Sequence, residues 1–412
     1  MNQQHVDIAI VGGGLAGASL ALLLAKNVPA LSVTLIEALP LQISISQPSP
    51  PSYDDRSSAL SLGSCKIFQS LGIWDELLPH LCAIKQVHVS DRGHPAGTIL
   101  DSARDQSQKN KRDALGYVVE NRHLGHVLLQ QLRKHTQIRV WSPARVNRVT
   151  PSSDGMLLQI EGNTSRLHAK LLVIADGADS TLREQLGIAS DRKPYHQSAV
   201  ITNITTSSAH QHIAFERFTD SGPMALLPLH DFAGEHRCAL VWTIQESEVD
   251  TVQQLDDSAF LQQIQQRFGT RLGFFTKAGK RSIYPLALHT AREQIRSHLV
   301  LMGNAAHSMH PVAGQGFNLT LRDCEALALT LREAQTRREN IGSLSVLQRY
   351  LDQQQLDQGK TINASHLLTL LFSTDATSAA FARNTGLFGL SFLPGIKQWF
   401  ARQATGLAGR GP

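Results

Sequence analysis

The first group of residues with a chemical pattern is Gly12-Gly13-Gly14-Leu15-Ala16-Gly17, which has the form G-x-G-x-x-G. Glu37 follows twenty residues after Gly17, at the end of the apolar run 33–36. Glycines at these positions permit a tight turn and a close approach to a pyrophosphate, and the acid can accept hydrogen bonds from ribose hydroxyls. The spacing therefore predicts that Gly12, Gly14, Gly17 and Glu37 bind a dinucleotide.

A second loop begins at Asp176-Gly177 and continues through Ser180 to Arg183. It follows the apolar run 171–175, and a helical pattern comes after it. The order of strand, Asp-Gly turn and helix matches that of the first loop. We expect Asp176 and Gly177 to lie beside the same cofactor.

The third loop extends from Gly303 to Asn318, between an apolar strand predicted at 298–302 and a helix predicted at 319–334. Its glycines let the backbone approach a flat or charged group, and a helix beginning near Gly316 directs its N-H groups and positive dipole end toward it. One fingerprint leaves NAD and FAD open, whereas three such loops favour a flavin bound in an extended pose. The residues expected to contact it are Gly303, Asn304, Pro311, Gly314, Gln315, Gly316 and Asn318.

The elements that must position these loops form an α/β pattern. Buried strands are predicted at 6–11, 33–36 and 171–175, and a helical stretch is predicted to open at Arg56 and continue to Leu71. Short alternating runs between residues 195 and 243 predict an antiparallel sheet, and residues 344–372 are expected to be helical. Residues 38–55 and 103–113 are polar and are expected to form loops.

Three units follow from this pattern. The cofactor-binding domain is discontinuous and comprises residues 1–80, 103–194 and 287–343. A substrate domain with the antiparallel sheet comprises residues 81–102 and 195–286. A helical C-terminal region comprises residues 344–412.

Composition excludes several other classes of protein. With 412 residues, 42% of them hydrophobic, the chain can bury a large core. The net charge of +5 comes from scattered basic residues with no Lys/Arg block, so no nucleic-acid groove is expected. Four dispersed cysteines indicate a reducing compartment, and no metal site is predicted. No stretch has the apolar length of a membrane span or a secretion signal, so a cytoplasmic protein is expected, with attraction to an anionic membrane left open.

The three signatures together resemble those of the class A flavoprotein monooxygenases, a superfamily of aromatic hydroxylases. The matching residues are the glycines of the first loop, the D-G-x-x-S-x-x-R of the second, and the third loop from Gly303 to Asn318. Within this superfamily the chain looks most like the hydroxylases of ubiquinone biosynthesis, on the basis of residues 87–94, 214–219 and 278–286. The resemblance covers nearly the whole chain. It implies a Rossmann-like FAD-binding domain of the para-hydroxybenzoate hydroxylase type.

The resemblance also implies a reaction and roles for particular residues. NADH or NADPH would reduce FAD, O2 would form a C4a-hydroperoxide, and one oxygen atom would enter the ring of a polyprenyl phenol. Glu37 would hold the adenosine ribose, Arg56 and Arg122 would reach the FAD phosphates and ribityl chain, and Asp176 would lie where FAD and the nicotinamide meet. Many relatives have Asp where this chain has Asn304, whose amide oxygen still accepts a hydrogen bond but carries no charge.

No residue is an obvious acid or base. His307, Pro311, Arg217 and Tyr284 are the candidates for the substrate pocket, with Arg281 on the same expected sheet. A structural hydrogen-bonding role is the favoured interpretation for His307 and His310. A flavin-dependent prenyl reductase and a non-redox carrier of prenylated partners remain alternatives.

The ring position, the prenyl length, the choice between NADH and NADPH, and a homo-oligomeric state are left open by the sequence. A membrane surface or other proteins of ubiquinone biosynthesis are the expected partners. The tail segment 387–399 has the aromatic and basic composition of an interfacial anchor, and a tail packed on the core is the alternative.

Overall fold

A computed structural model describes residues 3–41, 56–91, 97–101, 113–162, 166–219, 222–311 and 314–373. The loops expected at 38–55 and 103–113 lie almost wholly outside these ranges. The proposed anchor at 387–399 also lies outside the described residues. Among the helices that are described, none is long and apolar enough to cross a membrane.

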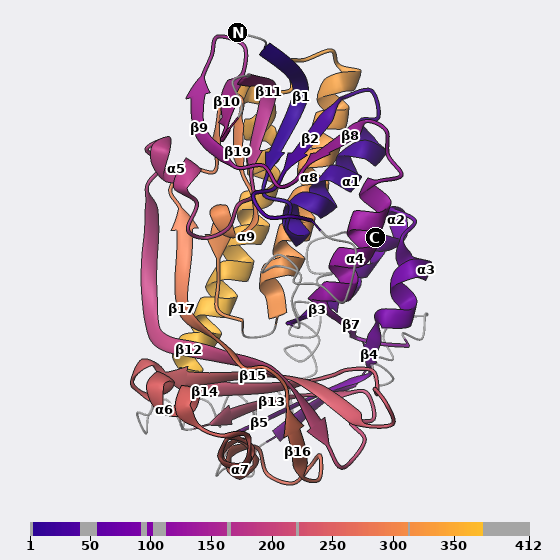
Figure 1. Cartoon of the computed structure of the whole chain (residues 1–412), viewed down its shortest axis with the longest axis vertical. Coiled ribbons are helices and arrows are strands. Elements are labelled where there is room, and N and C mark those ends of the chain that lie inside the picture. Colours follow the sequence, from indigo (N-terminus) through magenta and orange to yellow (C-terminus); the bar gives the residue numbers. More distant parts are fainter. Residues whose placement is uncertain are drawn as a thin grey trace.

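A mixed sheet forms the upper half of the molecule in Figure 1. Its central strands are parallel and lie in the order β19, β11, β1, β2, β8. Near their carboxyl ends, β1, β2, β11 and β19 are apolar runs because both faces of the sheet are covered there. The strands of this sheet are β1 (Gln3–Val11), β2 (Val33–Ile36), β8 (Ile138–Trp141), β9 (Val146–Pro151), β10 (Met156–Ile160), β11 (Arg166–Ile174), β18 (Ile295–Arg296) and β19 (Leu299–Leu301). The strand predicted at 171–175 forms the second half of β11, which begins at Arg166 and ends at Ile174.

Helices cover one face of this sheet. The β9–β10 hairpin pairs with the first part of β11, and its side chains pack with α5 against the other face of the central strands. The helical side shares one large core, in which Ile8, Ile10 and Val173 of the sheet are fully buried. The helices are α1 (Leu15–Asn27), α2 (Leu62–Ser70), α3 (Trp74–Leu77), α4 (Asn121–Leu132), α5 (Thr181–Gln185), α8 (Gln315–Thr336) and α9 (Leu344–Ser373). The prediction of a helix at 344–372 is confirmed by α9.

A second sheet lies across the lower end of the molecule, with α7 (Asp257–Phe268) beneath it and α6 (Val249–Gln254) at its left end (Figure 1). It is antiparallel as predicted, except that β13 and β5 are parallel. Its lower face packs on α7 through the buried Trp242, Phe260 and Phe268. The strands are β5 (Gln86–Asp91), β6 (Gly97–Asp101), β12 (Ser190–Thr206), β13 (Ile213–Thr219), β14 (Gly222–Pro228), β15 (His236–Gln245), β16 (Phe275–Ala278), β17 (Ser282–Ala291) and β20 (His307–Ser308).

Two long strands connect the halves. Both β12 and β17 begin or end beside the mixed sheet and continue into the antiparallel sheet, as Figure 1 shows. Their pairing register shifts between Pro194 and Gln197. The proposed domain boundaries at 194/195 and 286/287 therefore fall inside paired strands, and the two halves share a continuous backbone connection.

A small third sheet lies between the halves and corrects one prediction. It consists of β3 (Ser57–Ser61), β7 (Gly116–Glu120) and β4 (Cys82–Ile84). The helix expected to open at Arg56 begins only at Leu62, because residues 57–61 pair with β7 and the Ser61 hydroxyl accepts a hydrogen bond from the N-H of Ser64 as an N-cap.

Candidate active site

The three glycine-containing loops leave the carboxyl ends of three neighbouring parallel strands, β1, β11 and β19. Main-chain hydrogen bonds hold these ends together: the N-H of Ala175 donates to Val11 at 2.7 Å, and the N-H of Met302 donates to Ile174 at 2.8 Å. Ligands of open α/β sheets bind at this edge. The structure thus brings together Gly12, Asp176 and Gly303, which are far apart in the sequence.

Glycine is required at the first loop because the backbone is crowded there. Gly12 has φ +107°, and a Cβ at this position would lie 2.3 Å from the carbonyl oxygen of Ala175. A Cβ on Gly17 would lie 1.9 Å from the carbonyl oxygen of Gly12. The first turn of α1 can therefore approach the strand ends only with glycine at both positions.

Glu37 lies directly beside this turn. Its Oε2 accepts a hydrogen bond from the N-H of Gly13 at 2.7 Å, and its Oε1 accepts one from the N-H of Leu39 at 2.9 Å. These bonds fix the carboxylate next to the N-terminus of α1. Each oxygen keeps a lone pair that can accept a hydrogen bond from a sugar hydroxyl.

Asp176 lies at the start of the second loop. Its side chain is exposed on one side and lies against the protein on the other. Burial raises the pKa of its carboxyl above the ordinary value, and Glu37 adds to this effect. A hydrogen bond from Ser180 and the charge of Arg183 act in the opposite direction and favour the carboxylate. Gly177 beside it has φ +106°, and no neighbouring atom lies within 4 Å of where a Cβ would stand, so the backbone here borders open space.

Arg183 joins the second loop to the third. Its side chain is buried, and Nη1 donates to the carbonyl oxygens of Ala178 at 2.9 Å and Ala305 at 3.2 Å. The D-G-x-x-S-x-x-R pattern indicated that this arginine matters but assigned no role to it. In the structure it positions two loops relative to each other.

His307 has a structural environment, in agreement with the favoured interpretation. Its Nε2 lies 2.8 Å from Oδ2 of Asp323 on α8, and each side chain is 1% exposed. Gln358 on α9 donates to Oδ1 of the same aspartate at 3.1 Å. His310 is also buried, and burial lowers its pKa to about 4. Both rings anchor the third loop to neighbouring elements, and nothing in these contacts assigns them a proton transfer.

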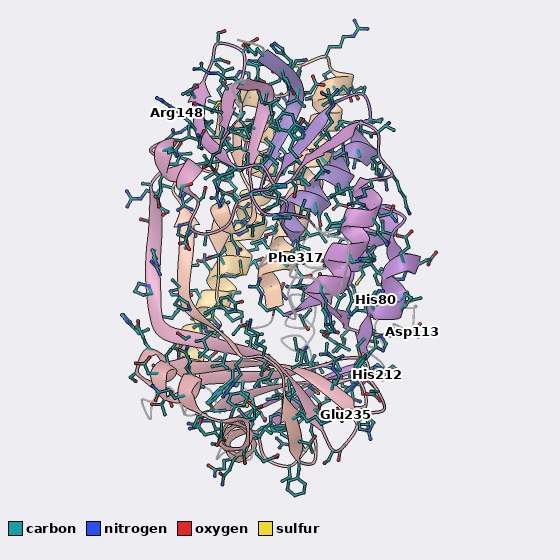
Figure 2. The ribbon with its side chains drawn as sticks, viewed as in Figure 1. His80, Asp113, Arg148, His212, Glu235 and Phe317 are labelled. Carbon is teal, nitrogen blue, oxygen red and sulfur yellow. The ribbon has the colours of Figure 1, made fainter. Side chains whose placement is uncertain are left out.

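The first turn of α8 begins at Gly314, which has φ +59° and caps the helix. Gln315 and Gly316 follow in its first turn, and the N-H of Gly314 donates to Pro311 at 3.0 Å. Figure 2 labels Phe317 in this turn, at the end of α8 that points toward the antiparallel sheet. The helix N-terminus is therefore directed between the two halves of the molecule.

The prediction that the Asn318 side chain contacts the cofactor needs correction. Its Oδ1 accepts hydrogen bonds from the N-H of Ser61 and the hydroxyl of Ser64, and its Nδ2 donates to the carbonyls of Ala59 and Gly314. An amide has two donor and two acceptor sites, and the protein uses all four. Asn318 instead ties α8 to the small sheet. Asn304, by contrast, is exposed in the single turn 303–305.

The candidates on the antiparallel sheet divide between its two faces. Nε of Arg217 donates to the carbonyl oxygen of Arg267 on α7 at 2.9 Å, and the guanidinium of Arg281 lies 5.0 Å from the ring centre of Phe260 on α7. Both arginines thus lie on the lower face, and their assignment to the substrate pocket is wrong. Tyr284 lies on the upper face, where the guanidinium of Arg56 is 5.0 Å from its ring centre.

Glu120, which the sequence did not single out, holds the halves together. One of its carboxylate oxygens accepts hydrogen bonds from Arg237 at 2.8 Å, from Asn203 at 3.1 Å and from Arg122 at 3.1 Å. Arg237 and Asn203 belong to the antiparallel sheet. In this structure Arg122, expected at the FAD phosphates, is paired with Glu120 beside the small sheet.

The residues at the strand ends fit a dinucleotide with an attached flavin. The backbone of the first turn is crowded and requires glycine, the Glu37 carboxylate lies beside that turn, and two helix N-termini supply N-H groups for negative charge. A nicotinamide dinucleotide needs only the first of the three loops, whereas all three here share one edge.

Comparisons with known proteins agree with this geometry. A family model described as an FAD binding domain matches residues 5–350. A ubiquinone hydroxylase, UbiL, of Rhodospirillum rubrum is 33% identical over 98% of this chain and 91% of its own length. The 3-demethoxyubiquinol 3-hydroxylase of Escherichia coli is 32% identical over 99% of this chain and 100% of its own length.

Solved structures share the fold at lower identity. The p-nitrophenol 4-monooxygenase PnpA of Pseudomonas putida superimposes with a TM-score of 0.79 at 18% identity, over 100% of both chains. A probable FAD-dependent monooxygenase of Pseudomonas aeruginosa, pqsL, gives a TM-score of 0.75 over 93% of this chain and 100% of its own. The predicted combination of an FAD-binding α/β domain, an antiparallel sheet and C-terminal helices is confirmed.

Proposed function

Since this chain belongs to the family of FAD-dependent monooxygenases that includes the ubiquinone hydroxylases, we propose that it hydroxylates the ring of a prenylated phenol on the route to ubiquinone. The substrate proposed is 2-octaprenyl-6-methoxyphenol, and the product is the corresponding 1,4-benzoquinol. The observation that carries the proposal is the similarity to ubiquinone hydroxylases along nearly the entire chain, including both sheets.

FAD is the cofactor, and when reduced by NADH or NADPH it activates O2 and supplies the oxygen atom that enters the ring. The protein binds and orients it. In the proposed complex, Glu37 accepts hydrogen bonds from the ribose, and the glycines at 12, 14 and 17 admit the pyrophosphate. The N-terminus of α8 at Gly314–Gly316 stabilises negative charge on the part of the flavin nearest to it.

The antiparallel sheet is proposed to close the site on the substrate side. Tyr284 and Arg56 meet where this sheet approaches the cofactor domain. A sheet that covers the flavin would hold the substrate ring against it and exclude water from the reaction. Tyr284 is thus retained as a pocket residue, together with Pro311 of the third loop.

A second candidate is a hydroxylase of another ring position in the same pathway. It is favoured by the similarity to the Escherichia coli enzyme, whose name specifies position 3. The prenyl-reductase and carrier alternatives have no such support.

The quinone intermediates of cells that lack this gene distinguish these candidates. We expect a 2-polyprenyl-6-methoxyphenol to accumulate and ubiquinone to fall, both restored by the intact gene. Accumulation of a 3-demethoxy intermediate would move the proposal to the other ring position. Unchanged ubiquinone would overturn both.

A polyprenyl phenol is nearly insoluble in water, so we propose that the enzyme receives it at a membrane surface or from a partner protein. The tail segment 387–399 combines Phe, Leu and Trp with Lys397, a composition suited to an interfacial anchor.

A further inference from the structure

Glu216 lies on β13, on the face of the antiparallel sheet that is turned toward the cofactor domain. Side chains alternate along a strand. Arg217 reaches α7 on the lower face, whereas Ala214 packs on the upper face with Val118 of the small sheet and Ile84 of β4. Glu216 therefore shares the upper face with Ala214, and the strand register places Tyr284 on this same face.

The surroundings of Glu216 are apolar. Its partners in the two neighbouring strands are Ala225 on β14 and Val89 on β5. Within the described ranges, no hydrogen bond or ion pair to its carboxylate is present. The charged neighbours in sequence and register, Arg217 and His88, lie on the opposite face, where His88 contacts the ring of Phe215.

Glu216 is surrounded by protein and is still partly accessible. Its carboxylate lies on the side of the sheet that is turned toward the cofactor domain. Burial raises the pKa of its carboxyl to about 7, and no charged group in the described part of the chain adds to this shift. A carboxylate in such a place weakens the fold, and no contact among the described residues compensates for it, so a functional role accounts for it better than a structural one.

We propose that Glu216 is a catalytic residue that accepts the hydrogen bond of the substrate's phenol hydroxyl and takes its proton. The proposal rests on the proposed function, because it requires a phenol between the sheet and the flavin. In this step the phenol O-H bond breaks, a carboxyl O-H bond forms, and the substrate becomes a phenolate. No oxidant or reductant takes part in the transfer.

The phenolate is the more reactive form for hydroxylation, because its negative charge increases the electron density of the ring. An unperturbed phenol such as that of tyrosine has a pKa of about 10, so it is almost wholly neutral near pH 7. A base whose pKa lies close to the working pH is well suited to accept the proton.

The test uses the FAD-loaded protein and a soluble probe, 2-isoprenyl-6-methoxyphenol, with Glu216→Gln as the variant. Two quantities are measured at several pH values between about 6 and about 8.5: the rate of NAD(P)H consumption, and the product formed per NAD(P)H consumed. Arg217→Gln is the matched control, because it removes a charge from the adjacent position on the opposite face. Glu216→Asp tests whether a shorter carboxylate restores part of the effect.

We expect the bound probe to be neutral in every variant before it reacts, because its pKa of about 10 lies above that of the base. The wild type and Arg217→Gln should couple NAD(P)H oxidation to product, with a product yield that rises with pH through the Glu216 pKa of about 7. Glu216→Gln should consume NAD(P)H at a rate within about two-fold of wild type, form at least about ten-fold less product and lose this pH dependence, since general-base catalysis contributes factors of this order or more. Glu216→Asp should recover part of the product yield.

Equal product yields and equal pH profiles in the wild type and Glu216→Gln would overturn the role of Glu216 and leave the proposed function standing. A wild type that binds the probe but never hydroxylates it would contradict the proposed function. Failure of the wild type to bind the probe would contradict both.

Discussion

Burial raises the pKa of two carboxyl groups near the proposed site, Asp176 and Glu216, and their different surroundings suit different tasks. Asp176 has Ser180 and Arg183 nearby, and both favour its charged form. Glu216 has apolar strand neighbours and no such support. The first is suited to carry a fixed charge at the edge of the cofactor site, and the second is suited to exchange a proton.

Replacing Asp176 by Asn should slow NAD(P)H-dependent flavin reduction by about ten-fold, the size expected when an interaction of about 1.4 kcal/mol with the transition state is lost. Asparagine keeps the shape and can still accept the hydrogen bond from Ser180, so FAD content should be unchanged. Stopped-flow absorbance of the flavin measures the rate. Asp179→Asn, an exposed neighbour in the same loop, is the control, and equal rates in all three proteins would assign Asp176 a structural role.

Glu216 should make stability depend on pH. Its pKa of about 7 in the folded chain lies above the ordinary value of 4.5, so the folded state favours the neutral acid. Stability should therefore fall as the pH rises from about 4.5 to 7, by no more than about 3 kcal/mol, and should change no further above that range.

Glu216→Gln lacks this titration, so its melting temperature should exceed that of the wild type at pH 8 and approach it at pH 4.5. Thermal unfolding of the FAD-bound proteins at both values measures the difference. A constant difference across this range would show that Glu216 titrates normally.

At the scale of elements, the side-chain amide of Asn318 fixes the position of α8 relative to the small sheet. Replacing Asn318 by Ala removes hydrogen bonds to three segments and leaves buried groups of Ser61 and Ala59 without partners. We expect a loss of about 3 kcal/mol in unfolding free energy and weaker FAD binding, because the helix N-terminus shifts.

Asn318→Asp is the matched variant, because it keeps the acceptor for Ser61 and Ser64 but loses both donated bonds. Its stability should lie between those of the wild type and the alanine variant. Chemical unfolding and fluorescence titration with FAD measure the two effects. An alanine variant with unchanged stability and FAD affinity would exclude this anchoring role.

The sequence predicted the elements around the cofactor well because continuous apolar runs, glycine turns and helix starts are local signals. It failed where long-range packing decides. Residues 57–61 pair as a strand because β7 lies beside them, and no local pattern shows this. Alternation along β13 was evident, but which face meets α7 was not, so Arg217 was assigned to the pocket and Glu216 beside it was missed.

Long-range packing also decided the roles of residues that belong to recognised sequence motifs. Asn318 and Arg183 belong to sequence patterns that indicate a binding site, yet their side chains bind other parts of the chain. A motif marks residues that must be present, and contacts across the fold decide whether each one reaches a ligand or positions another segment.

At the scale of the whole molecule, β12, β17 and the carboxylate of Glu120 join the two halves. The sequence predicted a cofactor domain and a substrate domain, but it did not predict this connection. Asn203 and Arg237 lie 83 and 117 residues from Glu120 along the chain, so no local pattern links them. The proposed site lies between the cofactor domain and the antiparallel sheet, and these two halves are joined. A residue of the sheet, such as Glu216, can therefore act on a substrate that is bound against the cofactor.

Truncation after Thr374 tests the proposed role of the tail in the whole protein. The cofactor loops precede this point, so the flavin spectrum should be retained, whereas binding to anionic liposomes and ubiquinone formation in cells should fall by about ten-fold or more. Full-length Lys397→Glu/Arg402→Glu is the control and should lose liposome binding without loss of fold. A truncated protein that releases FAD or precipitates would assign the tail to the core.

The central claim is that this protein inserts one oxygen atom from O2 into a prenylated phenol. The most direct measurement incubates the FAD-loaded protein with NADH or NADPH, 2-isoprenyl-6-methoxyphenol and oxygen-18 gas, followed by mass spectrometry of the extracted ring compounds. We predict a product that contains one labelled oxygen atom and depends on the electron donor. Recovery of unchanged phenol with hydrogen peroxide as the only reduced product, or a product labelled from water, would contradict this claim.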